Sequence, residues 1–218
     1  MRLVNNSERL VNIPSKGVRL EGALAIPDGV QGVVLFAHGS GSSRHSPRNN
    51  YVAQVLRRAG LGTLLIDLLT RDEDIDYQTR FDIGLLAERL DAATAWLMED
   101  DETSGKRIGY FGASTGAAAA LKSAAAAGNS IGAVVSRGGR PDLAMESLPK
   151  VVSPTLLVVG GRDELVIELN RAAYGRIKAE KEMVIVPGAT HLFEEPGALE
   201  EVANLAARWF KKYLKPLE

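Results

Sequence analysis

The pentapeptide Gly112–Gly116 (GASTG) has a serine, Ser114, at its centre. An apolar run precedes it and an alanine-rich segment follows it, which is the strand-to-helix setting of a nucleophile elbow. A serine on such a strained tight turn needs very small residues two positions to either side, and glycine meets that need. The spacing predicts a serine nucleophile. The simpler alternative is a glycine-rich turn with an incidental serine.

A serine hydroxyl is a weak nucleophile at neutral pH, so it requires a general base within hydrogen-bond reach. The chain has three histidines, His38, His45 and His191. His191 follows the apolar run 183–186, at the carboxyl end of an expected strand, where open α/β sheets place their sites. We therefore predict that His191 is the base. His38 is expected to brace its loop through hydrogen bonds, and His45, in a polar run, to be incidental.

A third residue, a carboxylate, should orient the histidine and stabilise its charged form. Asp163 ends the segment 155–163, in which an apolar run leads into two glycines, and it gives the chain order Ser, Asp, His. The alternative role of Asp163 is to cap a following helix. Glu164 and Asp67 are the rival carboxylates.

The loop 38–44 is rich in glycine and serine and follows an earlier apolar run. In this architecture, such a loop supplies one backbone N–H of an oxyanion hole, and the residue after the nucleophile supplies the other. We expect these donors to be the N–H groups of Ser40 and Thr115, the latter at the positive end of a helix.

Two arginines, Arg137 and Arg140, follow the apolar run 131–135 at the same edge of the expected sheet. Either could attract a substrate carboxylate through charge-assisted hydrogen bonds. The alternative is an internal salt bridge with Asp142 or Glu146. The sequence leaves both possibilities open, so the substrate-binding residues remain unassigned.

The chain alternates between apolar runs of strand length and segments with helical periodicity, which predicts a mostly parallel sheet covered on both faces. The expected strands are 18–26, 33–37, 61–69, 108–111, 131–135, 155–159 and 183–186, and the expected helices are 51–58, 81–98, 114–127, 164–179 and 199–213. The first two strands lack a helix between them, so we expect an antiparallel edge hairpin. The charged stretch 70–77 is expected to be a solvated excursion.

Length and composition predict one α/β domain over residues 1–218, since the chain has 45% apolar and 24% charged residues. A net charge of -1 without long blocks of one sign argues against binding to nucleic acid or membranes and favours a small-molecule ligand. Absence of an apolar leader or long apolar span predicts a cytoplasmic location. Oligomeric state is not predicted.

Metal and nucleotide cofactors are not expected. The histidines lack paired ligand spacing, and the zero cysteines exclude disulfides and thiolate sites. Gly105-Lys106 is not followed by serine or threonine, and the loop 39–44 lacks the third glycine of a dinucleotide fingerprint. Only residues 136–154 separate two late strands, so we expect no large lid and an open site suited to small acyl groups.

Four motifs taken together, HGSG at 38–41, GASTG at 112–116, GGRD at 160–163 and GATH at 188–191, resemble the α/β-hydrolase superfamily and its dienelactone-hydrolase-related branch. The resemblance spans essentially the whole chain. It implies an esterase-like hydrolase without a cofactor, with Ser114, Asp163 and His191 at the triad positions. Dienelactone hydrolases use a cysteine nucleophile, whereas this chain has serine at that position, so the resemblance does not imply dienelactone as substrate.

The expected reaction is hydrolysis of small carboxylic esters or lactones through an acyl-enzyme on Ser114. One alternative is an acyltransferase or perhydrolase that passes the same acyl group to an acceptor other than water. Another is a small-molecule-binding protein that keeps the fold without turnover, because a fold alone does not establish activity.

Overall fold

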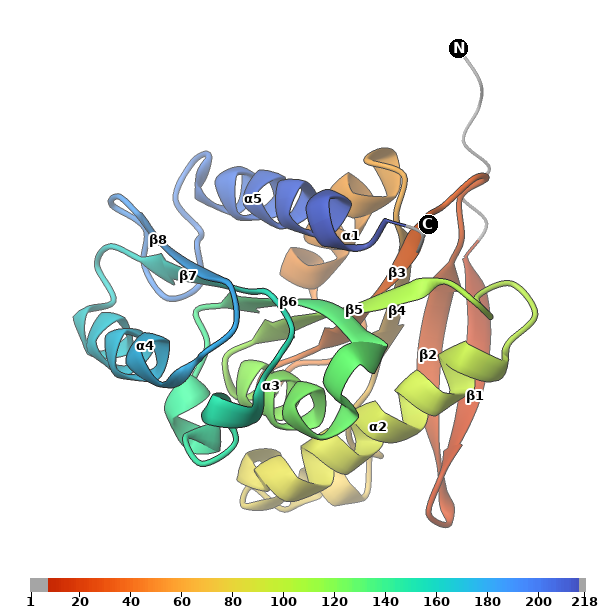
Figure 1. Ribbon diagram of the computed structural model, residues 1–218. Coiled ribbons are helices and arrows are strands. Elements are labelled where there is room, and N and C mark those ends of the chain that lie inside the picture. The colour runs from red at the N-terminus through yellow and green to blue at the C-terminus, as the bar shows by residue number, and fades with distance from the viewer. Residues whose placement is uncertain (1–7, 216–218) are drawn as a thin grey trace.

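A computed structural model describes residues 8–215. In these residues an eight-stranded sheet has the order β1-β2-β4-β3-β5-β6-β7-β8 (Figure 1). The strands are β1 (Arg9–Ser15), β2 (Val18–Ala25), β3 (Gly32–Ala37), β4 (Gly62–Ile66), β5 (Arg107–Ala113), β6 (Ile131–Arg137), β7 (Thr155–Gly160) and β8 (Lys181–Val186). The α-helices are α1 (Pro47–Arg58), α2 (Ile83–Glu99), α3 (Thr115–Ala127), α4 (Glu164–Arg176) and α5 (Ala198–Tyr213). The predicted α/β class is confirmed.

The six strands from β4 to β8 in the sheet order run parallel to their neighbours, and β2 pairs antiparallel with β4. The predicted antiparallel N-terminal edge is therefore confirmed, but the predicted hairpin partners are wrong. Residues 18–26 pair with the earlier strand β1, which the sequence reading missed, and β3 lies inside the parallel sheet.

The burial of each strand explains the error. In β1 only alternate residues are buried, and the exposed ones include Arg9 and Asn12. Its sequence therefore lacks the continuous apolar run that identified the other strands. Strand β3 is buried along its whole length, as expected for a strand with parallel neighbours on both sides and helices on both faces. Continuous burial rather than chain proximity therefore marks the centre of this sheet.

Helices cover both faces of the sheet (Figure 1). Helices α1 and α5 pack against each other over one face, and their core includes the ring pair Phe36 and Phe111, with centroids 4.9 Å apart. Helices α2 and α3 pack together over the other face, where α4 also contributes to the core. The alanines 117–120 are fully buried, because their small side chains let this helix lie close to the central strands.

Local signals account for where helices begin. Helix α1 begins four residues before the expected 51–58 segment, because the Ser46 side chain accepts from the Asn49 N–H and Pro47 occupies the first turn. Helix α2 begins after Asp82, whose side chain accepts from the Leu85 N–H. Capping residues thus decide helix starts that hydrophobic periodicity leaves open.

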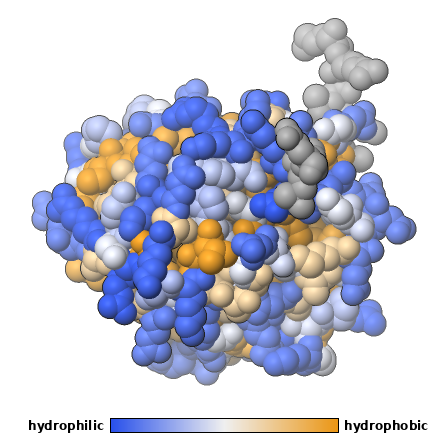
Figure 2. Space-filling view, viewed as in Figure 1, coloured by the Kyte–Doolittle hydropathy of each residue, from blue (hydrophilic) through white to orange (hydrophobic). Residues whose placement is uncertain are grey.

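The connection between β6 and β7 holds two short 3-10 turns, Pro141–Ala144 and Leu148–Lys150, and in the described residues no larger insertion covers this edge. This agrees with the expectation of no large lid. None of the helices in residues 8–215 combines the length and apolar character needed to cross a membrane. Figure 2 shows hydrophilic side chains spread over the viewed face, with smaller apolar patches between them.

Candidate active site

Ser114 forms the turn between β5 and α3, with φ 50° and ψ -122°. This left-handed backbone is unfavourable for a residue other than glycine, so surrounding contacts must hold it. A Cβ atom added at Gly112 would lie 2.4 Å from Ala117 Cα, and one at Gly116 would lie 2.2 Å from the Ala37 oxygen. The expected steric reason for the two flanking glycines is confirmed.

Asp163 and His191 lie together at the carboxyl edge of the sheet, just beyond β7 and β8. The Nδ1 atom of His191 is 2.6 Å from Asp163 Oδ2. The Asp163 side chain makes no capping hydrogen bond to α4, although it occupies the N-cap position. Of the rival carboxylates, Asp67 instead accepts hydrogen bonds from Arg44. Donation by Nδ1–H to Asp163 leaves Nε2 of His191 as the basic nitrogen.

Ser114 and His191 share neighbours at this edge. The Ser114 N–H donates to the Arg137 carbonyl at 3.3 Å, and a Cβ added to the next residue, Gly138, would lie 3.5 Å from His191 Cε1. Within residues 8–215 no hydrogen bond joins Ser114 Oγ to His191. Such bonds are commonly long before a substrate is bound. His191 is partly open to solvent, with 39% of its side chain exposed.

The loop after β3 contacts the start of α3. The Ser40 N–H donates to the hydroxyl of Thr115 at 3.0 Å, so this expected oxyanion donor already has an acceptor. Thr115 is buried and begins α3, where the first N–H groups lack acceptors within the helix. Ser40 and Thr115 are thus brought together, but through a side-chain contact that sequence reasoning missed.

His38 braces this loop, as its hydrogen bonds confirm. Its Nε2 accepts from the Leu68 N–H at 3.0 Å, which leaves Nδ1–H to donate to the Gly39 carbonyl at 2.9 Å. Burial lowers the pKa of His38 below its ordinary value. His45 is exposed and its backbone N–H donates to Ser43 Oγ.

The two arginines after β6 differ in their surroundings. Arg140 donates two hydrogen bonds to Asp142, at 2.9 and 2.8 Å, so the internal salt bridge is the correct alternative for it. Arg137 has no such carboxylate partner within residues 8–215. Its Nε and Nη1 atoms are buried without hydrogen-bond partners.

The charged stretch 70–77 is largely exposed, as expected of a solvated excursion, but a 3-10 turn and an ion pair order part of it. It contains the 3-10 turn Glu73–Ile75, a second turn, Thr79–Phe81, follows it, and Glu73 pairs with the buried Arg89 at 2.6 Å. The same stretch borders a hollow of about 230 Å³ that His38 and residues 42–45 also line. The ion pair was not predicted, because Arg89 is distant in sequence and its burial requires a counter-charge.

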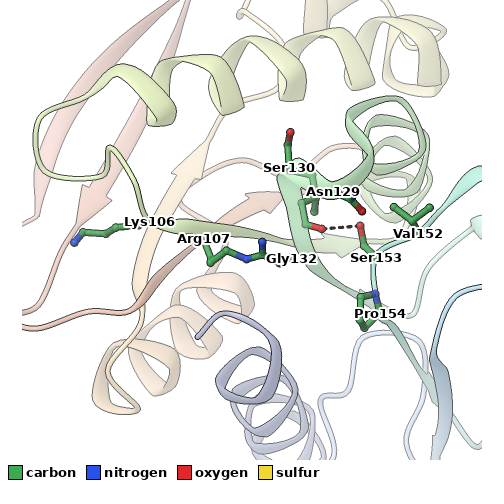
Figure 3. Close-up of a pocket in the computed structure, with 9 residues that line it drawn as sticks. Lys106, Arg107, Asn129, Ser130, Gly132, Val152, Ser153 and Pro154 are labelled. Atoms are coloured by element: carbon green, nitrogen blue, oxygen red, sulfur yellow. Dashed lines mark hydrogen bonds between the residues drawn. The ribbon is translucent and has the colours of Figure 1, made fainter. Parts of the chain in front are cut away.

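A larger hollow of about 630 Å³ lies at the opposite, amino edge of the sheet (Figure 3). Lys106, Arg107 and Ser153 are among its lining residues, and Ser153 donates to the Ile131 carbonyl. None of the candidate catalytic residues lines it. In the part of the chain that the structure describes, no group of three or more His, Asp or Glu side chains is arranged to hold a metal ion.

Comparison with known proteins decides the family. A family model described as "Dienelactone hydrolase family" matches residues 20–217. The chain belongs to this family. A dienelactone hydrolase of Anabaena variabilis with a solved structure is 57% identical, with a TM-score of 0.94, and the match covers 96% of this chain and 99% of that one.

Two other relatives carry names that differ from that of the family. Proteins of Mycobacterium tuberculosis strains CDC 1551 and H37Rv, provisionally named phosphoribosyl transferases, are 55% identical over 204 residues. The match covers 94% of this chain but only 46% of each relative, so the chain spans about half their length. An esterase of Pyrococcus furiosus, 20% identical with a TM-score of 0.78, shares the fold over 96% of this chain and 94% of that one.

Proposed function

We propose that this family member is a serine hydrolase that cleaves small carboxylic esters or lactones through an acyl-enzyme on Ser114. The observation that carries the proposal is the 2.6 Å contact between Asp163 and His191 at the sheet edge where Ser114 occupies its strained turn. The contact gives His191 one defined neutral tautomer, which is what a general base for a serine requires.

In the proposed reaction, Ser114 Oγ attacks the substrate carbonyl while Nε2 of His191 takes the serine proton. The N–H groups of Ser40 and Thr115 stabilise the oxyanion. His191 then protonates the leaving alcohol as the carbon–oxygen bond breaks, leaving an ester on Ser114. Water, deprotonated by His191, attacks this ester and releases the acid and free Ser114.

We do not propose a transferase activity for this chain, although its longer relatives are named transferases. We propose that the matched segment is the hydrolase part of those proteins, and that the activity in their name belongs to the length outside the match. The dienelactone hydrolase of Anabaena variabilis, matched over 99% of its own length, supports this division.

Covalent labelling tests the proposal. The purified protein is treated with a fluorophosphonate probe, the adduct is located by peptide mass spectrometry, and hydrolysis of short 4-nitrophenyl esters is measured in parallel. We expect labelling at Ser114 and loss of both labelling and turnover in Ser114→Ala. Ser130→Ala, at the opposite edge of the sheet, is the matched control and should keep both. A folded wild-type protein that is neither labelled nor active would contradict the proposal and favour a binding role.

A further inference from the structure

Arg137 is a buried cation without a counter-charge. It ends β6 between β5 and β7, pairing with Ala113 and Val158, and only 8% of the residue is exposed. Its Nε and Nη1 atoms are enclosed and unbonded. Nη2 also has no hydrogen-bond partner within residues 8–215, but it is not fully enclosed, so it is the guanidinium atom that solvent can reach.

Strand alternation shows which way Arg137 faces. Val135, two residues earlier, packs in the core under α1 and α5, whereas Ser136 lies on the opposite side, near Ala117 of α3. Residues two apart share a face, so Arg137 lies on the α1 side. Arg48, in the first turn of α1, is near enough for its charge to act on Arg137. The amino end of α1 adds a positive partial charge.

The local charge is only partly balanced. Arg48 pairs with Glu194 at 3.1 Å, on the loop that carries His191. Burial, and to a lesser extent the charge of Arg48, lower the pKa of Arg137 to about 10, so its guanidinium stays protonated at neutral pH. A buried charge without a partner is costly, and an anionic ligand would remove that cost. Arg140, already paired with Asp142, does not offer such a site.

We propose that Arg137, assisted by Arg48, forms an anion subsite that binds a carboxylate or phosphate group carried by the substrate. This inference rests on the proposed function in that the subsite serves the Ser114 reaction. The placement supports it, because the backbone of Arg137 is hydrogen-bonded to that of Ser114, and a Cβ added to the next residue, Gly138, would lie 3.5 Å from the His191 ring. The substrate class is therefore esters that bear an oxyanion a short distance from the reacting carbonyl.

A kinetic comparison tests the subsite. Two esters of equal acyl length are used, the anionic 4-nitrophenyl hemisuccinate and the neutral 4-nitrophenyl butyrate. We expect Arg137→Met to lower kcat/KM for the anionic ester by about tenfold or more, through KM, and to change the neutral ester by less than about twofold. Arg140→Gln is the matched control and should act equally on both esters. Equal losses on both esters in Arg137→Met would overturn the proposal.

Direct binding separates this inference from the proposed function. Titration calorimetry of Ser114→Ala with monomethyl succinate, methyl phosphate and methyl butyrate needs no turnover. We expect one or both anions to bind, and adding Arg137→Met to weaken that binding by about tenfold. Preference between the anions identifies carboxylate or phosphate. If the anions bind in an Arg137-dependent way but the wild type has no esterase activity, the proposed function is refuted and the anion subsite stands. If neither anion binds, the subsite proposal is overturned.

Stability controls show that the variants are folded. Replacing an unpaired buried charge by an apolar side chain of similar length is neutral or stabilising, so Arg137→Met should unfold at the same or higher urea concentration as the wild type. Arg137→Lys keeps the charge but loses the planar donor set, and we expect it to retain part of the anion preference. If Arg137→Lys is folded but shows as little preference for the anionic ester as Arg137→Met, the result would count against a charge-based site.

Discussion

Thr115 contributes two polar groups to the candidate site. Its hydroxyl accepts the Ser40 N–H at 3.0 Å, and its own N–H lies at the start of α3. In the ligand-free protein the Ser40 N–H is therefore already bonded. An oxyanion must share this donor or replace the hydroxyl as its acceptor. The hydroxyl has a second task in either case, because it holds the glycine-rich loop against the helix that follows Ser114.

Replacing Thr115 with valine removes the hydroxyl while keeping the shape. We expect kcat for a neutral 4-nitrophenyl ester to fall by about three- to tenfold, which corresponds to the net free energy of one hydrogen bond, because the loop is no longer held. Thr115→Ser keeps the contact and should remain near the wild type. A faster Thr115→Val would instead mean that the hydroxyl competes with the oxyanion for Ser40.

The burial of His38 leads us to predict that the stability of the protein depends on pH. An unfolded histidine binds its proton near pH 6.5, whereas burial lowers the pKa of folded His38. As pH falls below that value, the unfolded chain gains a proton that the folded one does not, so stability falls by at most about 1.4 kcal/mol per pH unit from this group.

The measurement is urea unfolding of wild type and His38→Gln between about pH 7.5 and about pH 5.5. Glutamine can still donate to Gly39 and accept from Leu68, but it does not titrate. The free energy of unfolding of the wild type should fall more steeply with decreasing pH than that of the variant. Parallel profiles would show that His38 does not contribute.

Single residues differ in how far the sequence predicts them. Asp163 was expected to pair with His191, and the structure brings the two together because each follows a neighbouring parallel strand. The choice between Arg137 and Arg140 could not be made, since it depends on which carboxylate the fold places nearby. Local spacing predicts a contact two residues away, such as Arg140 with Asp142, but not the absence of a partner.

At the level of elements, α3 is seated directly against the end of β3. A Cβ atom on Gly116 would lie 2.2 Å from the Ala37 oxygen and 2.4 Å from the His38 oxygen. Both are backbone atoms, so no flexible side chain can move aside. The position of the helix, and with it the turn at Ser114, depends on this close approach.

Gly116→Ala should therefore force α3 away from the strand. We expect it to lower the free energy of unfolding by about 3 kcal/mol and to abolish most esterase activity. Gly175→Ala is the matched control: Gly175 lies in α4, and a Cβ there meets no atom within 4 Å. In urea unfolding, the free energy of unfolding of this control should rise by about 0.5 kcal/mol. Equal effects of the two variants would contradict the steric explanation.

The elements follow from the sequence to different degrees. The alanine-rich α3 and the buried strands were predicted, because propensity and continuous apolar runs are local signals. Strand β1 and the turns at 73–81 were missed. Strand β1 was missed because only alternate residues of it are buried, although its partner β2 follows directly in the chain. The turn at Glu73 depends on the buried Arg89, which lies in another element.

For the whole molecule, the sequence predicted the layers but not the sheet order at its N-terminal side. Insertion of β4 between β2 and β3 separates strands that are adjacent in the chain. The β-α-β rhythm predicts parallel pairing from β5 onward, where chain order and sheet order agree. The candidate catalytic residues follow three strands of that regular half, β5, β7 and β8, which is why they could be predicted.

The regular half of the sheet also fixes the distance between residues at the ends of neighbouring strands. Ser114 directly follows β5 and Arg137 ends the neighbouring strand β6, and paired strands lie roughly 4.8 Å apart. Ser114 and Arg137 are one spacing apart at the backbone. A molecule that reaches both must carry its two recognised groups a few bonds apart. The site then selects for the length of the connecting chain more than for bulk, and the rigidity of the sheet fixes that length.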